Sequence, residues 1–406
     1  MAIEQRIGAI GALKPDDMIE KFQDLIEEVC STSTLSNLNK IVEYLLTESN
    51  HVHNTVIKAC LLHLAMSISP IKSHELREVA EFTVSEIKKS VSRFDEADFA
   101  LREALFTYFL SLGMWTEGAE VLGGANFDSS ELSDIKKADT YIKCAEAYLE
   151  DNAGYEAENY VNKASPLMKD SNVAKDWQLQ LRYRVVFARV LDSNKKFTDA
   201  ALRYYHLSNT EGELEVEEED LLDLYGKAMA CAILGKIGPQ RTRVLLLLQK
   251  DPRLSSIGIR KPKYEAHCSL LVKMSNGNLI NPKELEVFSK SILPHQNAGA
   301  GNGFSIPENA VLEHNLFVAG NIYDNISLKE LGKLLSLDVV SAERVTCRMI
   351  SEGRLQASIN QEDGFLYFNL TGGSSDDLST KIASICEQVN DCVELIEASR
   401  SLESVA

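Results

Sequence analysis

Apolar residues follow a helical period through most of this chain. From about residue 17 to residue 290 they recur at spacings of three and four, as in the segment that contains Met18, Phe22, Leu25, Ile26 and Val29. Since an α-helix has 3.6 residues per turn, each such segment predicts a helix with one buried face. The same pattern recurs at 35–46, 56–68 and 76–91. Strand-like alternation is absent here, so we predict an all-α region.

A rough repeat of helix pairs follows. The predicted pairs are 99–112 with 116–122, 138–149 with 155–164, and 181–191 with 197–207. Trp115, Tyr155 and Phe197 open the second helix of each pair, and small residues follow: Gly118, Ala119, Ala157, Ala200 and Ala201. We expect the aromatic to fill the gap between paired helices and the small residues to permit close approach. A unit of this kind cannot bury its apolar face alone, so we predict a TPR/HEAT-like solenoid.

The pattern changes after the glycine-rich run Asn297-Ala-Gly-Ala-Gly-Asn-Gly303. Helices are predicted at 310–319, 328–335 and 340–350, with a short strand at 325–327. Segments 355–360 and 365–369 alternate with a period near two around Asp363-Gly364, which is typical of a β-hairpin. This order predicts a winged helix. The predicted domains are a helical-repeat solenoid at 1–290, a flexible loop or linker at 291–307, a winged-helix module at 308–370 and a C-terminal helix at 371–406.

The C-terminal segment has a narrow apolar seam with a heptad period. Its members, spaced alternately by four and three, are Leu378, Ile382, Ile385, Val389, Cys392 and Ile396. Such a seam requires a covering surface. One reading is a helix that docks on its own winged helix; the other is a helix bundled with partner chains, and these six residues are then partner-binding.

The net charge favours protein partners over nucleic acids and anionic membranes. The 406 residues carry a formal net charge of −18, which disfavours binding to phosphate backbones or anionic membranes. No apolar run reaches the ~20 residues that span a bilayer. The winged-helix segment has five basic residues against six acidic ones, so nucleic-acid binding is disfavoured. The open edge of its sheet could instead accept a neighbour's strand. The hairpin residues proposed for this contact are Leu355, Phe365 and Tyr367.

One basic cluster stands out in this acidic chain. It comprises Arg241, Arg243, Lys250, Arg253, Arg260, Lys261 and Lys263. It is either a solvated helix end or a docking patch for an acidic partner, to which Arg241 and Arg243 would contribute. The short apolar run 244–248 within it predicts a buried helical segment.

Residues that could carry chemistry are few. His51-Val-His53 is followed by Asn54, Thr55 and Val56, and no aspartate occurs until Asp95. Since HExxH is also absent, the two histidines are expected to flank a helix start. No phosphate-binding loop or nucleophile elbow occurs. Eight scattered cysteines without a CxxC pair indicate reduced thiols of a cytosolic or nuclear protein. We predict no catalytic residue, metal site or cofactor.

Several segments resemble a known family. The most specific are Ala310-Val-Leu-Glu-His-Asn-Leu316, Tyr323-Asp-Asn-Ile326 and Met349-Ile-Ser-Glu-Gly-Arg354, with Pro294-His-Gln296 in support. With the order of helical repeats, winged helix and terminal helix, they resemble the PCI-domain family of the proteasome lid, the signalosome and initiation factor three. The likeness is greatest to the subunit-four branch of the COP-nine signalosome, and it covers roughly residues 95 to 370.

This resemblance implies a non-catalytic scaffold subunit of a hetero-oligomer. The signalosome removes Nedd8 from the cullins of RING ubiquitin ligases, and its protease is a separate zinc-dependent subunit. The implied partners are the other PCI subunits, the metalloprotease-type subunits and a cullin-RING ligase, in the cytoplasm and nucleus. A PCI subunit of the proteasome lid is the alternative, and a winged-helix nucleic-acid-binding protein is the second alternative.

Overall fold

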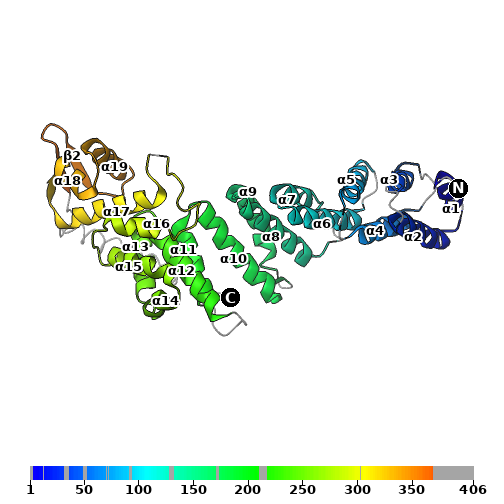
Figure 1. The fold of residues 1–406 in the computed structure, drawn as a ribbon, viewed down its shortest axis with the longest axis horizontal. Helices are drawn as coiled ribbons and strands as arrows, with labels where there is room; N and C mark the ends of the chain where they lie inside the picture. Colours follow the sequence, from blue (N-terminus) through cyan, green and yellow to red (C-terminus); the bar gives the residue numbers. More distant parts are fainter. Residues whose placement is uncertain are drawn as a thin grey trace, which may run out of the picture. The chain divides into compact units, whose positions relative to one another are not determined.

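The computed structural model describes residues 3–11, 13–31, 36–48, 53–69, 71, 73–90, 94–127, 132–170, 173–209, 217–301 and 303–368. Helices dominate, with one small sheet among the described residues, so the predicted all-helical character is confirmed (Figure 1). The chain forms two compact units, Met1–Cys231 with Pro294–Gln296, and Ala232–Leu293 with Asn297–Ala406. The boundary predicted at residue 290 lies inside the second unit. None of the described helices combines the length and the apolar character needed to cross a bilayer.

The first unit is built from consecutive helices. They are α1 (Ile3–Ile10), α2 (Pro15–Ser31), α3 (Ser36–Glu43) with the π-helical turn η1 (Tyr44–Glu48), α4 (Asn54–Ile68), α5 (His74–Lys89), α6 (Asp95–Ser111), α7 (Trp115–Gly123), α8 (Asp134–Glu150), α9 (Gly154–Leu167), η2 (Val173–Lys175), α10 (Trp177–Ser193), α11 (Phe197–Ser208) and most of α12 (Glu218–Leu234). From α6 to α11 each helix packs on the next, and α8 also packs on α10. This is the stacking of a helical-repeat solenoid.

Three helix pairs of this unit share one turn geometry. At Gly113, Asn152 and Lys195 the backbone is left-handed, with φ of 76°, 58° and 61°. In each turn the next N–H donates to a carbonyl five residues back: Met114 to Phe109, Ala153 to Tyr148, and Lys196 to Leu191. This is a Schellman-type helix end, which favours glycine or asparagine at the left-handed position. The repeat predicted from sequence is therefore also a repeat of backbone conformation.

The small residues of the repeat behave as expected, but one aromatic does not. Gly118, Ala119, Ala157, Ala200 and Ala201 are all buried, and a Cβ at Gly118 would lie 3.2 Å from Phe109 Cβ. Phe197 is buried and Trp115 is half-buried against the core. The prediction that Tyr155 fills a gap between helices is wrong. Its side chain is 73% exposed, because it lies on the outer face of the first turn of α9.

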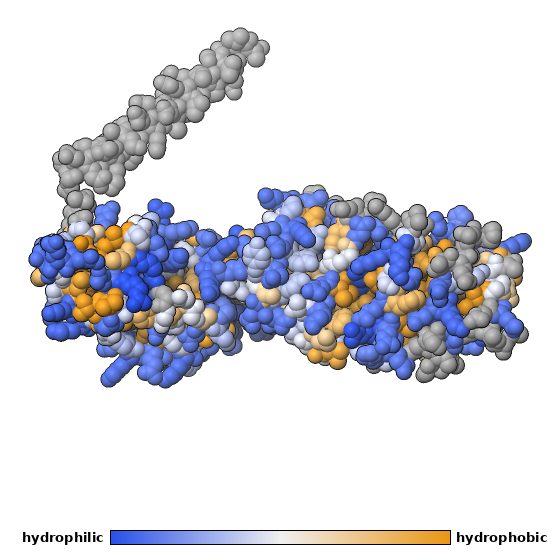
Figure 2. Space-filling model, turned by 90° about the horizontal axis from the view of Figure 1, so that it is seen from above, coloured by the Kyte–Doolittle hydropathy of each residue, from blue (hydrophilic) through white to orange (hydrophobic). Residues whose placement is uncertain are grey.

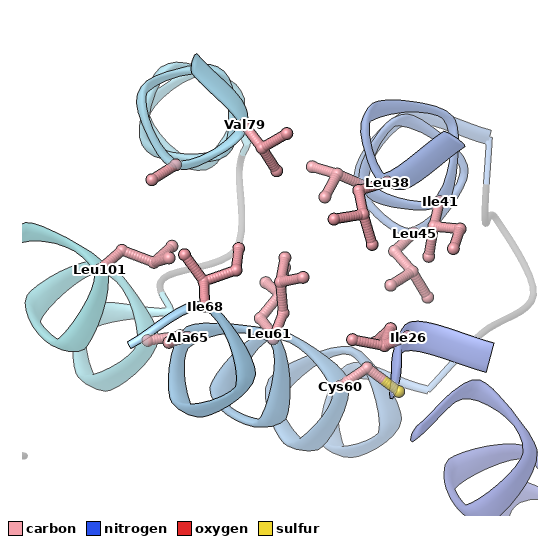
Figure 3. Close-up of a cluster of buried hydrophobic side chains, with 14 of the residues drawn as sticks. Ile26, Leu38, Ile41, Leu45, Cys60, Leu61, Ala65, Ile68, Val79 and Leu101 are labelled. Carbon is pink, nitrogen blue, oxygen red and sulfur yellow. The ribbon is translucent and has the colours of Figure 1, made fainter. Parts of the chain in front are cut away.

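A large hydrophobic cluster holds the N-terminal helices together. Ile68, Leu61 and Ala65 of α4 lie at its centre, with Val79 of α5 and Leu101 of α6 on one side (Figure 3). Ile26, Leu38, Ile41 and Leu45 close the other side. Burial of such side chains stabilises the fold by roughly 1.5–3 kcal/mol each. His53 caps α4 by accepting a hydrogen bond from Thr55 N at 3.4 Å, as expected for a helix start. His51 lies outside the described residues.

The second unit contains shorter helices followed by a mixed module. Its elements after the end of α12 are α13 (Pro239–Gln249), α14 (Leu254–Arg260), η3 (Pro262–Tyr264), α15 (Glu265–Ser275), α16 (Pro282–Ser289), α17 (Ile306–Ile322), β1 (Asn325–Ser327), α18 (Leu328–Leu335), α19 (Val339–Ser351), β2 (Ala357–Asn360) and β3 (Phe365–Phe368). We refer to residues 306–368 as the C-terminal module. Its predicted order of helix, strand, two helices and hairpin is confirmed element by element.

Local chemistry explains where these elements begin. Ser305 and Asn281 start α17 and α16 with capping boxes, in which Glu308 and Glu284 reach back to the cap N–H. Pro307 and Pro282 occupy the first turns, where a missing N–H has no cost.

Before α17, the loop folds back on itself. Ala300 N donates to Phe304 O at 2.9 Å, and Ile306 N donates to Ala298 O at 3.0 Å. A small sheet-like turn therefore leads into the C-terminal module.

Candidate partner-binding surfaces

The sheet of the C-terminal module has the order β1-β3-β2, with antiparallel pairing throughout. Ile326 and Ile359 both face Leu366 in the register, so β3 is the central strand. Among the described residues, β1 and β2 each pair on one side only. Their outer N–H and C=O groups are therefore candidates for pairing with another strand.

The three predicted hairpin contacts lie in different environments. Leu355 is 7% exposed and belongs to the core of the module together with Leu366 and Met349. It precedes β2 and completes the module's own packing, so it is not available for the partner contact that was predicted for it. Phe365 and Tyr367 are 36% and 39% exposed. Because β3 is central, these two rings lie on the outer face of the sheet and not at its edge.

Apolar side chains also reach the surface elsewhere on this module. Figure 2 shows hydrophobic patches between hydrophilic residues at the end of the view that carries α18, α19 and β2. The large apolar side chains of the module that are more than a third exposed are Phe317, Ile322, Tyr323, Val339, Val340, Phe365 and Tyr367. Exposed apolar patches of this type mark protein contacts more often than solvated surface.

Arg241, the first member of the predicted basic cluster, does not lie on the surface. Arg241 is 4% exposed, and its guanidinium donates to Ala232 O at 3.2 Å and to Ile233 O at 3.0 Å. It satisfies carbonyls at the end of α12, where a helix leaves four acceptors unpaired. Burial lowers the pKa of Arg241 to about 10, so it stays charged at neutral pH, and the Glu313 carboxylate opposes this shift. Arg241 is therefore a structural residue, contrary to both readings of the cluster.

The neighbouring residues of α13 divide between core and surface. Arg243 is exposed and remains a candidate contact. Val244, Leu245 and Leu248 are buried, whereas Leu246 and Leu247 are 40% and 38% exposed. The predicted buried helical segment at 244–248 is therefore helical and buried at Val244, Leu245 and Leu248, but the prediction is wrong for Leu246 and Leu247, because the helix carries consecutive residues around its whole circumference.

A buried polar row on α17 is the feature that sequence reasoning did not assign. Glu313 accepts hydrogen bonds from Arg348 Nη2 at 3.1 Å and from Arg354 Nη2 at 2.9 Å. Asn315 binds the backbone of Ile280 twice, accepting from its N–H at 2.9 Å and donating to its C=O at 3.0 Å.

Beside them, His314 Nε2 lies 2.9 Å from Asn278 O. Burial lowers the pKa of His314 to about 4. This row ties α17 to α19 on one side and to the loop before α16 on the other. Three adjacent polar residues inside the apolar run 310–320 were the available signal.

A second buried polar cluster lies in the first unit. Asp192 is 2% exposed, and Gln296 Nε2 donates to its two carboxylate oxygens at 2.9 and 3.0 Å. His295 Nε2 lies 3.2 Å from the same carboxylate. The thiol of Cys231 lies 3.8 Å from Gln296 Nε2, and burial raises its pKa well above the ordinary value. A buried protonated thiol is a poor nucleophile, so the cluster anchors segment 294–296 and has no reactive geometry.

The remaining predicted contacts are those of the C-terminal apolar seam. Leu378, Ile382, Ile385, Val389, Cys392 and Ile396 all lie outside the described residues. Their role stays a prediction. Within the described ranges, no group of three or more His, Cys, Asp or Glu side chains is arranged to hold a metal ion.

Comparison with known proteins places the chain among PCI proteins. A family model described as PCI domain matches residues 293–370, and one described as PSMD12/CSN4, N-terminal matches residues 16–215. The chain is 32% identical to COP9 signalosome complex subunit 4 of Arabidopsis thaliana over 93% of both chains. It is 32% identical to the Drosophila melanogaster subunit 4, over 94% of this chain and 90% of that protein. It is 30% identical to the Dictyostelium discoideum subunit 4, over 93% and 92%.

Proposed function

The chain belongs to the family of COP9 signalosome complex subunit 4, and from that premise we propose that it is a non-catalytic scaffold subunit of a signalosome. In this proposal the complex removes Nedd8 from cullin-RING ubiquitin ligases, and the isopeptidase resides in another, metalloprotease-type subunit. This chain contributes to assembly and to receiving the cullin ligase, in the cytoplasm and nucleus.

The observation that carries the proposal is the one-sided pairing of the outer strand β2. Among the described residues, Ala357–Asn360 pairs only with β3, which leaves one row of backbone groups for a neighbouring chain. We interpret the C-terminal module as a winged helix, and a series of such modules could join their sheets across subunits. The exposed rings of Phe365 and Tyr367 lie on the face of the adjacent strand β3 and would add apolar contact area.

Internal ion pairs favour a protein partner over nucleic acid. If α19 and the turn after it were to bind in a DNA groove, their basic residues Arg344, Arg348 and Arg354 would have to be available. Arg348 is instead engaged with Glu313, and Arg354 is engaged with both Glu313 and Glu352. Lys333 pairs with Glu330 at 2.8 Å. Most positive charge on the module is therefore neutralised by its own carboxylates.

Affinity purification of the tagged full-length chain at its native level tests this function. We expect mass spectrometry to find the other PCI and metalloprotease-type signalosome subunits, together with cullin-RING ligase components. The isolated chain should leave a neddylated cullin intact, whereas the purified complex should release Nedd8. Recovery with proteasome-lid subunits would support the alternative assignment, and recovery of monomer alone would contradict both. A duplex-DNA shift at about 50 mM salt would support the nucleic-acid reading.

A further inference from the structure

A groove on the first unit is lined by two arginines that have no acidic partner among the described residues. It runs along α9, α10 and α11, with a volume of about 680 Å³ where Phe187, Leu202 and Arg203 line it. A smaller hollow of about 240 Å³ continues from it, lined by Arg184, Arg203, His206 and Leu207. The two share Arg203 and His206, so they form one groove with an apolar floor and a basic end.

Arg184 and Arg203 differ from the other arginines around them. On the same helix α10, Arg182 pairs with Asp139 at 2.7 Å and with Glu146 at 2.5 Å, and Arg189 pairs with Glu150 at 2.8 Å. Arg184 and Arg203 are exposed and form no ion pair with any described carboxylate. In a chain with 60 acidic and 42 basic residues, two guanidinium groups that line one hollow without a partner among the described carboxylates are a local departure from the overall charge.

The geometry of Arg203 prepares it for an anionic group. Its guanidinium carbon lies 3.7 Å from the centre of the Phe187 ring. Stacking of this kind holds the plane of the guanidinium while its N–H donors, which point outward in that plane, stay available. A carboxylate matches this fork with two parallel hydrogen bonds. The stacking also reduces the side-chain entropy that is lost when a ligand binds.

The acidic residues of the groove do not cancel this charge. Glu158 is engaged with Lys196 Nζ at 2.6 Å and with Asn194 Nδ2 at 2.7 Å. Asp199 also lines the groove and has a partner of its own. The lining therefore contains Arg184, Arg203 and Lys196 against Glu158 and Asp199, an excess of one positive charge with His206 neutral.

We propose that this groove is a docking site for an acidic peptide segment of a partner protein, in which carboxylates bind Arg184 and Arg203 and an apolar side chain lies beside Phe187 and Leu202. The charge of the lining selects against basic segments, and the apolar floor selects against purely polar ones. The inference does not depend on the function proposed above, because it concerns a surface of the helical repeats and can be tested on the isolated full-length chain.

Fluorescence anisotropy with two labelled octapeptides tests the site. One probe alternates glutamate and leucine, and the matched probe has glutamine in place of glutamate. We expect the full chain to bind the glutamate probe more tightly than the glutamine probe, with an affinity that falls as salt rises. Arg184→Ala and Arg203→Ala should each raise the Kd for the glutamate probe about five- to tenfold, as expected for loss of a charge-assisted hydrogen bond at a partly exposed site.

Two further variants make the result specific. Lys169→Ala removes the same charge from an exposed residue that does not line the groove, and it should leave the Kd within about twofold. Arg203→Lys keeps the charge but loses the planar fork, so its Kd should lie between those of the wild type and Arg203→Ala. Neither arginine pairs with a described carboxylate, and loss of the stacking of Arg203 on Phe187 should cost no more than about 1 kcal/mol, so the variants should stay folded, with unfolding temperatures close to that of the wild type.

Several outcomes would overturn the proposal. These are an unchanged Kd in the Arg184→Ala/Arg203→Ala double variant, an equal loss in Lys169→Ala, or equal binding of the glutamine probe. A probe that carries phosphoserine in place of glutamate would overturn the carboxylate assignment if it bound more than about tenfold tighter, because that preference identifies a phosphate site.

Discussion

At the scale of single residues, the three left-handed turn positions of the repeat carry residues that differ in how easily they adopt this conformation: Gly113, Asn152 and Lys195. Gly113 has φ 76°, and a Cβ there would meet no atom within 4 Å, so only the backbone conformation disfavours a side chain. Gly113→Ala should therefore destabilise the first unit by about 1 kcal/mol. Gly113→Asn should cost less, since Asn152 adopts this conformation in the next repeat. Thermal unfolding of the variants measures both, and equal losses would contradict the conformational argument.

A buried histidine predicts how the second unit responds to acid. His267 is 1% exposed between the rings of Tyr264 and Phe288, and burial lowers its pKa from 6.5 to about 4. The unfolded chain then binds the proton first, so this histidine's contribution to stability is lost as pH falls from about 7 towards 4. The resulting decrease in the free energy of unfolding should reach about 2 kcal/mol near pH 5.

The variant His267→Phe isolates that contribution. Phenylalanine keeps a ring between Tyr264 and Phe288 and cannot be protonated. We expect the variant to gain stability relative to the wild type between pH 7.5 and pH 5, as measured by urea unfolding at both values. A difference that is the same at the two pH values would show that His267 does not contribute to acid sensitivity.

At the scale of elements, α17 holds the C-terminal module through Glu313. Glu313 is 7% exposed, and its carboxylate accepts hydrogen bonds from Arg348 of α19 and from Arg354 in the turn after it. Glu313→Gln leaves Arg348 without its counter-charge and Arg354 with Glu352 alone, so it should cost about 2–3 kcal/mol. Hydrogen exchange should then accelerate at the amides of α19 and β2. The matched change Glu330→Gln breaks the exposed pair with Lys333 and should cost less than about 0.5 kcal/mol.

The positions of the helices could be predicted from hydrophobic periodicity, but the burial of single side chains could not. Spacings of three and four located α2, α4, α8 and α10, because the core contacts of a helix repeat every 3.6 residues. The same rule cannot tell which of two adjacent apolar residues faces a neighbour, as Leu245 and Leu246 show.

The burial and the partners of the polar residues also depend on tertiary contacts. Arg241 looked like surface charge, but the end of α12 supplies carbonyl acceptors that only the folded unit brings near. Asp192 and Gln296 are separated by 104 residues, so no local pattern could pair them. Leu355 lies at the hairpin as predicted, and the packing of Met349 and Leu366 around it determines that it is buried. Burial and pairing of single residues therefore required the structure.

At the scale of the whole molecule, the proposed scaffold role depends on surfaces that a neighbouring chain completes. The seam Leu378, Ile382, Ile385, Val389, Cys392 and Ile396 lies outside the described residues, and its heptad spacing predicts one apolar face. An aspartate within a covered seam would bury an unpaired charge, which costs several kcal/mol. Ile385→Asp or Val389→Asp should therefore release the chain from its complex.

The readout of this last prediction must separate release from misfolding. The tagged chain should lose its co-purifying subunits in Ile385→Asp, while the thermal unfolding of the helical repeats stays unchanged. Thr380→Asp adds the same charge at a position outside the seam and should leave the complex intact. If Ile385→Asp instead retains every partner but lowers the unfolding temperature of the second unit, the seam packs against its own chain. The open strand β2 and the exposed rings of Phe365 and Tyr367 would then be the remaining candidates for the assembly contact, because they do not depend on the seam.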